Sequence, residues 1–458
     1  MTKLRFIGFS AFVFCSAAIA YAMPGQQAKQ LATAAISKSD TAAFNALAAA
    51  AQKHDRTAEN WLAYVYAARH DTMNAVKWWK DAAHRGASRS QEHLATLYAI
   101  GEGVPQDGSR AFKWYMAAGN QGNVKAQLAL GDIYYQGKYV TQDYVKAMHW
   151  YLVAANQGDP SAEASVGEMF RDGLSVPQNF KTAQTWFQKS SQAGNSFGEY
   201  DLGMLYYDGK LGTIDYNRAV KWLTAAAGEG LPKAESRLGR MYEIGHGVTA
   251  DDSIALSWYQ KAAAQDDPNA QYRLGRMYAA GKGIKQDYAA AVHLYQLAAN
   301  QNLGSAVTSL GYMYEHGYGV TKSYDKAKSL YLSAAALGDP VADNNLGVMF
   351  RYGEGVPKDF FQAVRWYRRA ADQNFADALG NLADMYLNGY AVREDYVASY
   401  ALADLAEIRS GAFASRVREL SSLLTGKQRI VAHHLAGQMQ KVGILKALDS
   451  YMAHLWSN

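Results

Sequence analysis

The sequence predicts an all-α protein, a right-handed α/α solenoid of stacked antiparallel helix pairs with a 36-residue period. The first observation is a glycine that recurs seven times at this interval, here called the glycine position: Gly131, Gly167, Gly203, Gly239, Gly275, Gly311 and Gly347. The second is that apolar residues follow helical spacing on both sides of a glycine-rich break in each unit. Seven copies in step indicate one helix pair stacked on itself.

Each recurring residue of the unit has a packing reason. A glycine inside a helix costs about 1 kcal/mol relative to alanine, so its recurrence predicts that a second helix passes too close for a side chain. A tryptophan follows by 19 residues in most units, but Leu294 and Leu330 fill that place in two. This exchange favours an apolar filler between layers over a cofactor contact.

Turns and prolines give the ends of the helices. The turn Gly245-His246-Gly247-Val248 follows a helix and not a strand, so it is predicted as a left-handed helix end rather than a phosphate-binding loop. Four prolines lie seven residues before the glycine position, where the first residue of a helix is expected: Pro160, Pro232, Pro268 and Pro340.

The chain is predicted to have four parts. Residues 1–22 carry Lys3, Arg5, an apolar stretch over 6–20 and a small-residue site at Ala20-Tyr21-Ala22, which predicts a secretory signal; an uncleaved anchor is the alternative. Residues 23–56 are predicted as an N-terminal helical cap. Residues 57–410 are predicted as about ten solenoid units, the first lacking the glycine turn. Residues 411–458 are predicted as C-terminal capping helices at about 412–424 and 426–442, followed by a tail. The expected location is periplasmic or secreted.

Composition excludes several classes of function. The formal net charge is +5 and is spread along the chain, so no nucleic-acid partner is expected. Cys15, the single cysteine, lies in the predicted signal, so the mature chain would hold no disulfide, catalytic thiol or thiolate metal site. No membrane span is expected after signal cleavage, because no other run is long and apolar enough.

The sequence carries no recognisable catalytic or metal motif. Its eleven histidines include no His-Glu-x-x-His pair, and the adjacent His433 and His434 would point about 100° apart on a helix. His246 and His316 lie near turns and are interpreted as solvated loop residues. We therefore expect no enzyme activity, no catalytic residue, no metal and no cofactor.

The repeated unit resembles the Sel-1-like repeat family of the tetratricopeptide-like superfamily. The clearest copy is Ala270 to Ala306, with Leu274-Gly275, Tyr278, Gly281-Lys282-Gly283-Ile284, Asp287-Tyr288, Ala291, Tyr295 and Ala298-Ala299, and the resemblance covers roughly residues 60–440. It implies an α/α solenoid that acts as a scaffold or adaptor, and some bacterial relatives take part in exopolysaccharide export. A cysteine-rich subgroup is associated with β-lactam binding or slow hydrolysis, but this chain lacks the paired cysteines of that subgroup.

A protein partner is expected on the surface of the first helix of each unit. Positions −3, +1, +4 and +5 from the glycine position, here called the first-helix face, point away from the predicted packing surface. They carry tyrosine and arginine, which are enriched at interface hot spots. The candidate partner-binding residues are Tyr200, Tyr207, Arg240, Tyr272, Arg276, Tyr312, Arg351 and Tyr352, joined by the acidic Asp132, Glu168, Glu243 and Glu315.

The predicted function is an exported interaction scaffold of a bacterial cell envelope, which binds protein partners through a concave solenoid surface. The alternative for the site is that the same residues are ordinary helix-surface residues and bind no partner. At the level of function, the alternatives are binding of envelope carbohydrate or peptidoglycan, since tyrosine and tryptophan stack on sugars, and β-lactam hydrolysis.

Overall fold

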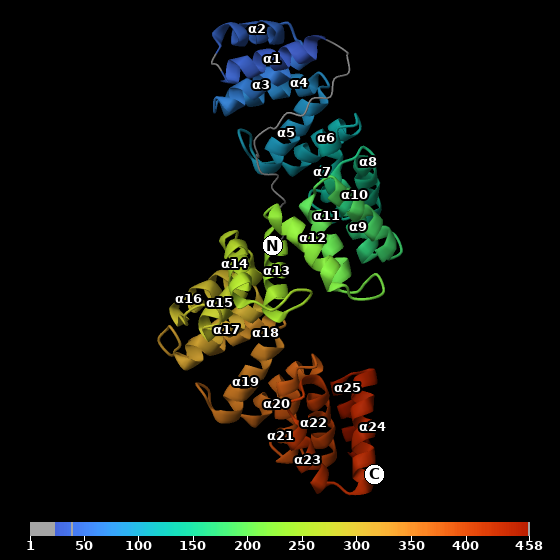
Figure 1. Ribbon diagram of the computed structural model, residues 1–458, viewed down its shortest axis with the longest axis vertical. Coiled ribbons are helices and arrows are strands. Elements are labelled where there is room, and N and C mark those ends of the chain that lie inside the picture. The colour runs from blue at the N-terminus through green and yellow to red at the C-terminus, as the bar shows by residue number, and fades with distance from the viewer. Residues whose placement is uncertain (1–22, 38–39, 457–458) are drawn as a thin grey trace. The chain divides into compact units, whose positions relative to one another are not determined.

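The computed structural model describes residues 23–37 and 40–456, and the predicted signal segment lies outside them (Figure 1). Every regular element within these residues is an α-helix, so the predicted all-α solenoid of stacked helix pairs is confirmed. The described residues form two compact units, one that ends at Asp201 and one that begins at Leu202, and α11 (Ser196–Tyr207) contains the boundary.

The helices of the first unit are α1 (Met23–Ser37), α2 (Thr41–Gln52), α3 (Arg56–Ala68), α4 (Thr72–His84), α5 (Ser88–Ile100), α6 (Gly108–Gly119), α7 (Val124–Gln136), α8 (Tyr144–Ala155), α9 (Pro160–Asp172) and α10 (Phe180–Gln192). Those of the second unit that belong to repeats are α12 (Tyr216–Gly228), α13 (Pro232–Ile244), α14 (Asp252–Ala264), α15 (Pro268–Ala280), α16 (Tyr288–Asn300), α17 (Gly304–His316), α18 (Tyr324–Ala336), α19 (Pro340–Tyr352), α20 (Phe360–Asp372), α21 (Ala376–Leu387) and α22 (Tyr396–Ser410). The chain then continues with α23 (Ala414–Leu423), α24 (Gly426–Val442) and α25 (Ile444–Trp456).

Short side chains and glycines define where the helices begin and end. An aspartate caps α14, where the Asp251 side chain accepts hydrogen bonds from the backbone N–H groups of Ser253 and Ile254, and equivalent residues cap the other second helices. The helices α9, α13, α15 and α19 begin at the four predicted prolines. Gly245 and Gly281 end their helices with φ of 75° and 68°, which confirms the predicted left-handed helix ends.

At the glycine position the two helices of each pair make a close contact, and this contact is here called the seam. A Cβ added to Gly347 would lie 2.5 Å from Cε1 of Tyr367, and the same clash recurs at Gly131, Gly167, Gly239, Gly275 and Gly311 with the ring 20 residues further along. The opposing residues are Tyr151, Phe187, Tyr259, Tyr295, Tyr331 and Tyr367, with Leu223 opposite Gly203, and all are buried. The prediction of a close approach is therefore confirmed, and the group that approaches is an aromatic ring in most pairs.

The tryptophans one residue earlier lie between layers, as predicted, but they are only half-buried. Trp150 packs against an apolar cluster that includes Leu130 of its own pair and Ala118 of the preceding pair. Its Cζ3 atom lies 3.4 Å from the place that a Cβ on Gly119 would take. The same half-buried position is held by Trp114, Trp186, Trp222, Trp258 and Trp366. The deepest aromatic position of the repeat is thus the tyrosine after the tryptophan, which the sequence interpretation did not single out.

A buried side chain four residues before the glycine position ties successive layers together. Gln127 donates from Nε2 to the carbonyl oxygen of Gly119 at the end of α6, and it accepts from Gln157 after α8 at 2.6 Å. The second of these bonds, here called the clasp, recurs as Gln121 to Gln91, Gln265 to Glu235, Gln301 to Gln271 and Gln373 to Asp343. Because buried polar groups lose free energy when unpaired, the clasp favours one closure of each pair, and the bond from Gln127 to Gly119 favours one placement of that pair on the preceding one.

The ends of the array differ from the repeats. In the first unit, α1 and α2 bury Leu47, Ala32 and Ala51 against Leu62 and Val65 of α3, and a short turn in place of a glycine turn joins α3 to α4. In the second unit, α23, α24 and α25 extend the apolar cluster of α21 and α22.

The predicted tail after residue 442 is wrong in part, because 444–456 is helical. Ile444, Ala447 and Leu448 fall on one buried face of α25, and this pattern was too short to recognise in the sequence.

We expect Gly347→Ala to destabilise the protein even though alanine is the better helix former. The new Cβ must displace the fully buried Tyr367 ring, and overpacking of this kind costs roughly 1–3 kcal/mol. Gly437→Ala in α24 is the matched control, because no atom lies within 4 Å of its added Cβ. Urea unfolding should show a loss for Gly347→Ala and a gain of up to about 1 kcal/mol for Gly437→Ala. Equal gains at both positions would refute the seam.

We expect Asp343→Asn to flatten the pH dependence of stability. Burial raises the pKa of Asp343 to about 6, with Asp339 adding to the rise and Arg369 opposing it. A raised folded-state pKa contributes stability at low pH that is lost as the pH rises through about 6, so the wild type should lose about 1.4 kcal/mol from this group between pH 5 and 7.5. Urea unfolding at both pH values measures the difference between the two proteins. The exposed Asp377→Asn is the control, and a difference for Asp343→Asn that does not change with pH would contradict the assignment.

Candidate binding site

The first-helix face is crossed by polar contacts between adjacent layers. In the first unit Arg171 Nη1 lies 2.8 Å from Asp201 Oδ1, and in the second unit Arg273 Nη1 lies 3.2 Å from Glu243 Oε2. Both pairs join position +4 of one layer to position −2 of the next. Much of the charge on this face therefore serves to hold neighbouring first helices together.

The acidic residues predicted for partner binding include several that have structural roles. Asp132 accepts a hydrogen bond from the hydroxyl of Tyr151 at 2.8 Å, Glu243 from Tyr259 at 2.6 Å, and Glu315 from Tyr331 at 2.5 Å. Burial, with help from the neighbouring carboxylate, raises the pKa of Tyr331, so the phenol stays a donor. The prediction overlooked that the seam tyrosines reach this face with their hydroxyl groups.

The eight predicted partner-binding residues differ in exposure. Tyr352 is 60% exposed and Tyr312 is 45% exposed, and Arg276 is also exposed. The other five are half-buried: Tyr200, Tyr207, Arg240, Tyr272 and Arg351. The three exposed residues, all in the second unit, are the most accessible of the predicted set.

Several of the half-buried residues pack on neighbours instead of facing solvent. The Tyr272 ring centroid lies 5.9 Å from that of the seam Tyr295, and the Arg276 guanidinium lies 6.0 Å from the Tyr272 ring. Tyr207 lies below the guanidinium of Arg237 at 5.1 Å. These contacts support ordinary surface packing for part of the predicted set.

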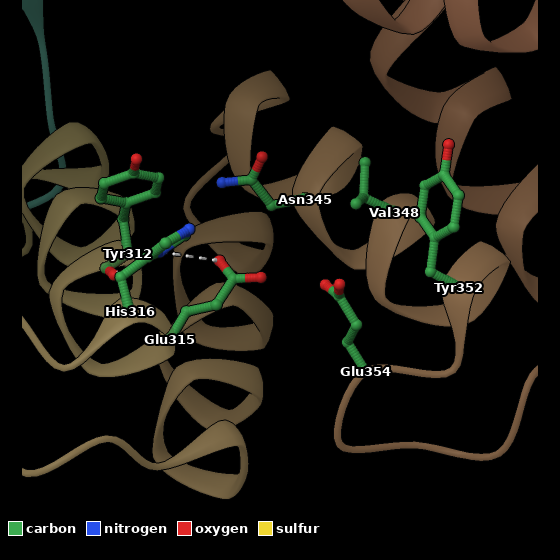
Figure 2. A pocket seen from close by; sticks show the side chains of 7 residues that line it. All are labelled: Tyr312, Glu315, His316, Asn345, Val348, Tyr352 and Glu354. Atoms are coloured by element: carbon green, nitrogen blue, oxygen red, sulfur yellow. Dashed lines mark hydrogen bonds and ion pairs between the residues drawn. The ribbon is translucent and has the colours of Figure 1, made fainter.

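Tyr312 and Tyr352 line one cavity of about 400 Å³ between α17 and α19 (Figure 2). Tyr312, Glu315 and His316 come from α17, and the other lining residues are Asn345, Val348 and Tyr352 from α19 and Glu354 from the turn that follows. Figure 2 shows the α17 side chains facing those of α19 and its turn across an open space. The lining carries two carboxylates and no lysine or arginine.

Stacked aromatic rings extend from this cavity along the edge of the layers. The ring centroids of Tyr312 and His316 lie 4.1 Å apart, those of His316 and Tyr318 5.5 Å apart, and those of Tyr318 and Tyr288 4.8 Å apart. His316 is thus the last residue of a helix, placed between two tyrosines. The interpretation of the two histidines as solvated loop residues holds only in part: His316 is exposed but belongs to α17, and His246 lies in a turn but is half-buried and stacks on Tyr216 at 4.1 Å.

The cavity includes residues that the sequence interpretation missed. Asn345 and Val348 lie at positions −2 and +1 of α19, and Glu354 lies in a glycine turn that we had interpreted only as a helix end. Position +1 was among those of the predicted face, but valine was not considered a binding residue. Nothing in the sequence indicated that the turn after α19, which carries Glu354, helps to line a cavity between the first helices of two successive pairs.

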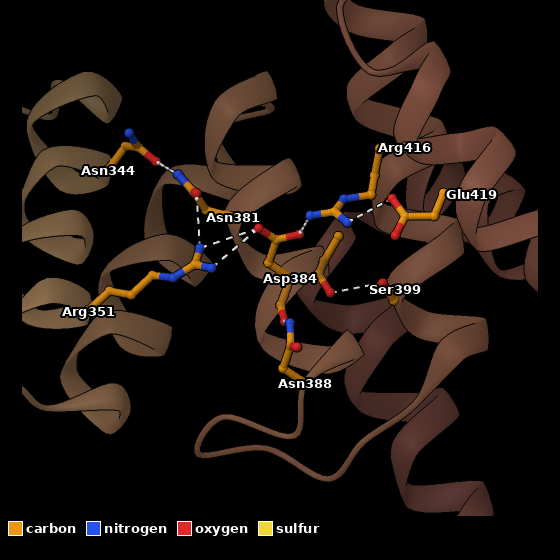
Figure 3. A network of polar contacts seen from close by, with 9 residues as sticks. Asn344, Arg351, Asn381, Asp384, Asn388, Ser399, Arg416 and Glu419 are labelled. Atoms are coloured by element: carbon orange, nitrogen blue, oxygen red, sulfur yellow. Dashed lines mark hydrogen bonds and ion pairs between the residues drawn. The ribbon is translucent and has the colours of Figure 1, made fainter. Parts of the chain in front are cut away.

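The chain covers the same face at its C-terminal end with its own residues (Figure 3). Arg416 of α23 forms an ion pair with Asp384 of α21, and Arg351 of α19 reaches the other carboxylate oxygen of Asp384 at 3.3 Å. Phe413 lies against Gly380, where an added Cβ would be 2.1 Å from the ring. Gly380 and Asp384 occupy positions −3 and +1 of α21, so α23 binds to the first-helix face of the last repeat.

Two further findings limit the chemistry of the described residues. No group of three or more histidine, cysteine, aspartate or glutamate side chains among them is placed to hold a metal ion. No helix in the part of the chain that the structure describes is long and apolar enough to cross a membrane.

The fold and its repeat agree with one family. The model of the Sel1 repeat matches nine consecutive segments: 88–123, 124–159, 160–195, 196–231, 232–267, 268–303, 304–339, 340–375 and 376–406. These segments cover more than half of the chain, and the protein therefore belongs to the Sel1 repeat family. This is a scaffold fold suited to protein–protein interaction.

Two solved structures show the likeness along the chain. A protective antigen present in uropathogenic Escherichia coli strains, which displays an SLR fold, is 30% identical with a TM-score of 0.68, and the match covers 94% of this chain and 97% of the antigen. A Sel1 repeat protein from Oxalobacter formigenes is 31% identical with a TM-score of 0.48, over 69% of this chain and 93% of that protein. Comparison with the curated proteins gives no significant match.

Proposed function

We propose that the protein is a non-catalytic scaffold that binds a protein partner at the cavity between α17 and α19. The observation that carries this proposal is the cavity of about 400 Å³ that two of the eight predicted residues, Tyr312 and Tyr352, line from opposite sides while both remain exposed. Large exposed tyrosines beside a hollow are the side chains and the shape that interface hot spots use.

The construction of the repeat supports this function. The seam holds Tyr331 and Tyr367 fully buried directly behind α17 and α19. These buried rings keep the two first helices in place, so little ordering is needed when a partner binds. A preorganised surface of this kind binds through shape and a few strong contacts.

We also propose that the protein is exported to the envelope or the outside of a bacterial cell. The proposal rests on Lys3 and Arg5, the apolar stretch over 6–20 and the small residues Ala20 and Ala22. Its relative in Escherichia coli, described as a protective antigen, is in keeping with an exported protein. N-terminal sequencing of the protein recovered from the cell envelope should begin at Met23, and an intact residue 1 in a cytoplasmic fraction would overturn the proposal.

We expect the double substitution Tyr312→Ala and Tyr352→Ala to abolish capture of the partner. Both rings are exposed, so the loss should come from binding and not from unfolding, and each hot-spot ring contributes on the order of 2 kcal/mol. Capture from native envelope extract, followed by mass spectrometry, compares the double variant with Phe361→Ala, whose ring is 71% exposed on the second-helix surface of α20. Circular dichroism melts should match for all three proteins.

Two outcomes would count against the proposed function. A protein captured equally by the wild type and the double variant places binding elsewhere. Retention of purified envelope polysaccharide or peptidoglycan by the wild type, and its loss from the double variant, would favour the carbohydrate-binding alternative, because tyrosine rings also stack on sugars.

A further inference from the structure

The cavity between α17 and α19 has the chemistry of a site for a basic side chain. Its lining combines the two exposed tyrosine rings with the carboxylates of Glu315 and Glu354. Glu315 is 9% exposed, and one of its oxygens is occupied by the Tyr331 hydroxyl. An aromatic ring and a carboxylate together attract a guanidinium or an ammonium group.

Other charged groups around the cavity leave it acidic. His316 Nδ1 lies 3.9 Å from Glu315 Oε2. Lys322 lies on the turn after α17, and its ammonium group is held over the Tyr324 ring at 4.6 Å. The Tyr324 hydroxyl raises the pKa of Lys322, with Glu354 and Glu315 adding to the rise, so the lysine stays charged. One lysine stands against the two carboxylates, which leaves the cavity acidic.

The last repeat shows how a basic segment sits on this face. There, α23 places Phe413 against Gly380 and Arg416 on Asp384, and Glu419 lies 3.0 Å from the same arginine. Phe413 and Arg416 are three residues apart, which is one helical turn. They cover positions −3 and +1 of α21. On α17 and α19 the −3 residues, Thr308 and Asn344, are buried, whereas the +1 residues, Tyr312 and Val348, line the cavity.

We infer that the cavity binds an arginine or lysine side chain carried on an amphipathic segment of the protein partner. The segment lies over the +1 positions of α17 and α19, with its basic group between Tyr312 and Tyr352 and directed to Glu354 and to the Glu315 oxygen that the Tyr331 hydroxyl does not use. An apolar residue one turn earlier contacts Val348. This inference rests on the proposed function and adds the chemistry of the partner.

Selection from a library of random displayed peptides tests this inference with the purified chain as bait. Peptides that compete with one another for the cavity should be rich in arginine or lysine. Replacing the basic residue of a selected peptide with glutamine should weaken binding by about tenfold, and binding should weaken further at high salt. On the protein, Glu354→Gln should weaken binding severalfold and Glu354→Lys by more than tenfold.

Matched variants keep the test decisive. Glu354 lies on a surface turn, so its substitution leaves the seam intact, and Glu229→Gln at the end of α12 is an exposed control that should bind as the wild type does. Peptides that need Tyr312 and Tyr352 but carry no basic residue, or that ignore Glu354→Lys, overturn this inference and leave the proposed function standing. Peptides that bind the Tyr312→Ala and Tyr352→Ala double variant undiminished, or a library that yields no binder, overturn both.

Discussion

The contact between a glycine in one helix and a ring in the next determines the rest of this fold. At Gly347 and most of its equivalents the missing side chain lets an aromatic ring, usually a tyrosine, lie directly on the backbone of the first helix. The contact sets the spacing within each pair, and at Tyr151, Tyr259 and Tyr331 it places the hydroxyl on the first-helix face. At the last repeat Ala383 takes the glycine position, and the residue 20 positions later is Ala403, so a small residue replaces the ring where the seam ends.

The seam also explains the electrostatics of the binding face. The hydroxyl groups of the seam tyrosines donate to a carboxylate in three layers, where Asp132, Glu243 and Glu315 are the acceptors. A carboxylate used in this way has one oxygen already hydrogen-bonded, so only its other oxygen can bind a group of the partner. The surface that remains for recognition is therefore made by the side chains that the seam does not occupy, chiefly Tyr312, Tyr352 and Glu354.

Features that depend on the backbone could be predicted from the sequence. Three backbone features require a particular residue type and could therefore be recognised in the sequence. They are the glycine inside a helix, the proline at a helix start and the left-handed glycine at a helix end, and the structure contains all three. The partners of polar side chains on the first-helix face could not be predicted, because they lie about 30 residues away on another layer, as with Arg351 and Asn381. The helix α25 was missed for a related reason. It does not repeat, and its buried face contains only a few apolar residues.

The clasp has a consequence for how such a chain changes in length. In the shortened first pair, Arg85 bonds to Glu59 at 3.0 Å in the place where later pairs use glutamine, although the intervening turn is four residues shorter. The closure of a helix pair is thus insensitive to the loop that joins its two helices. A unit gained or lost as a whole would keep this bond, because both partners belong to one pair, whereas the ion pairs between first helices depend on which pairs become neighbours.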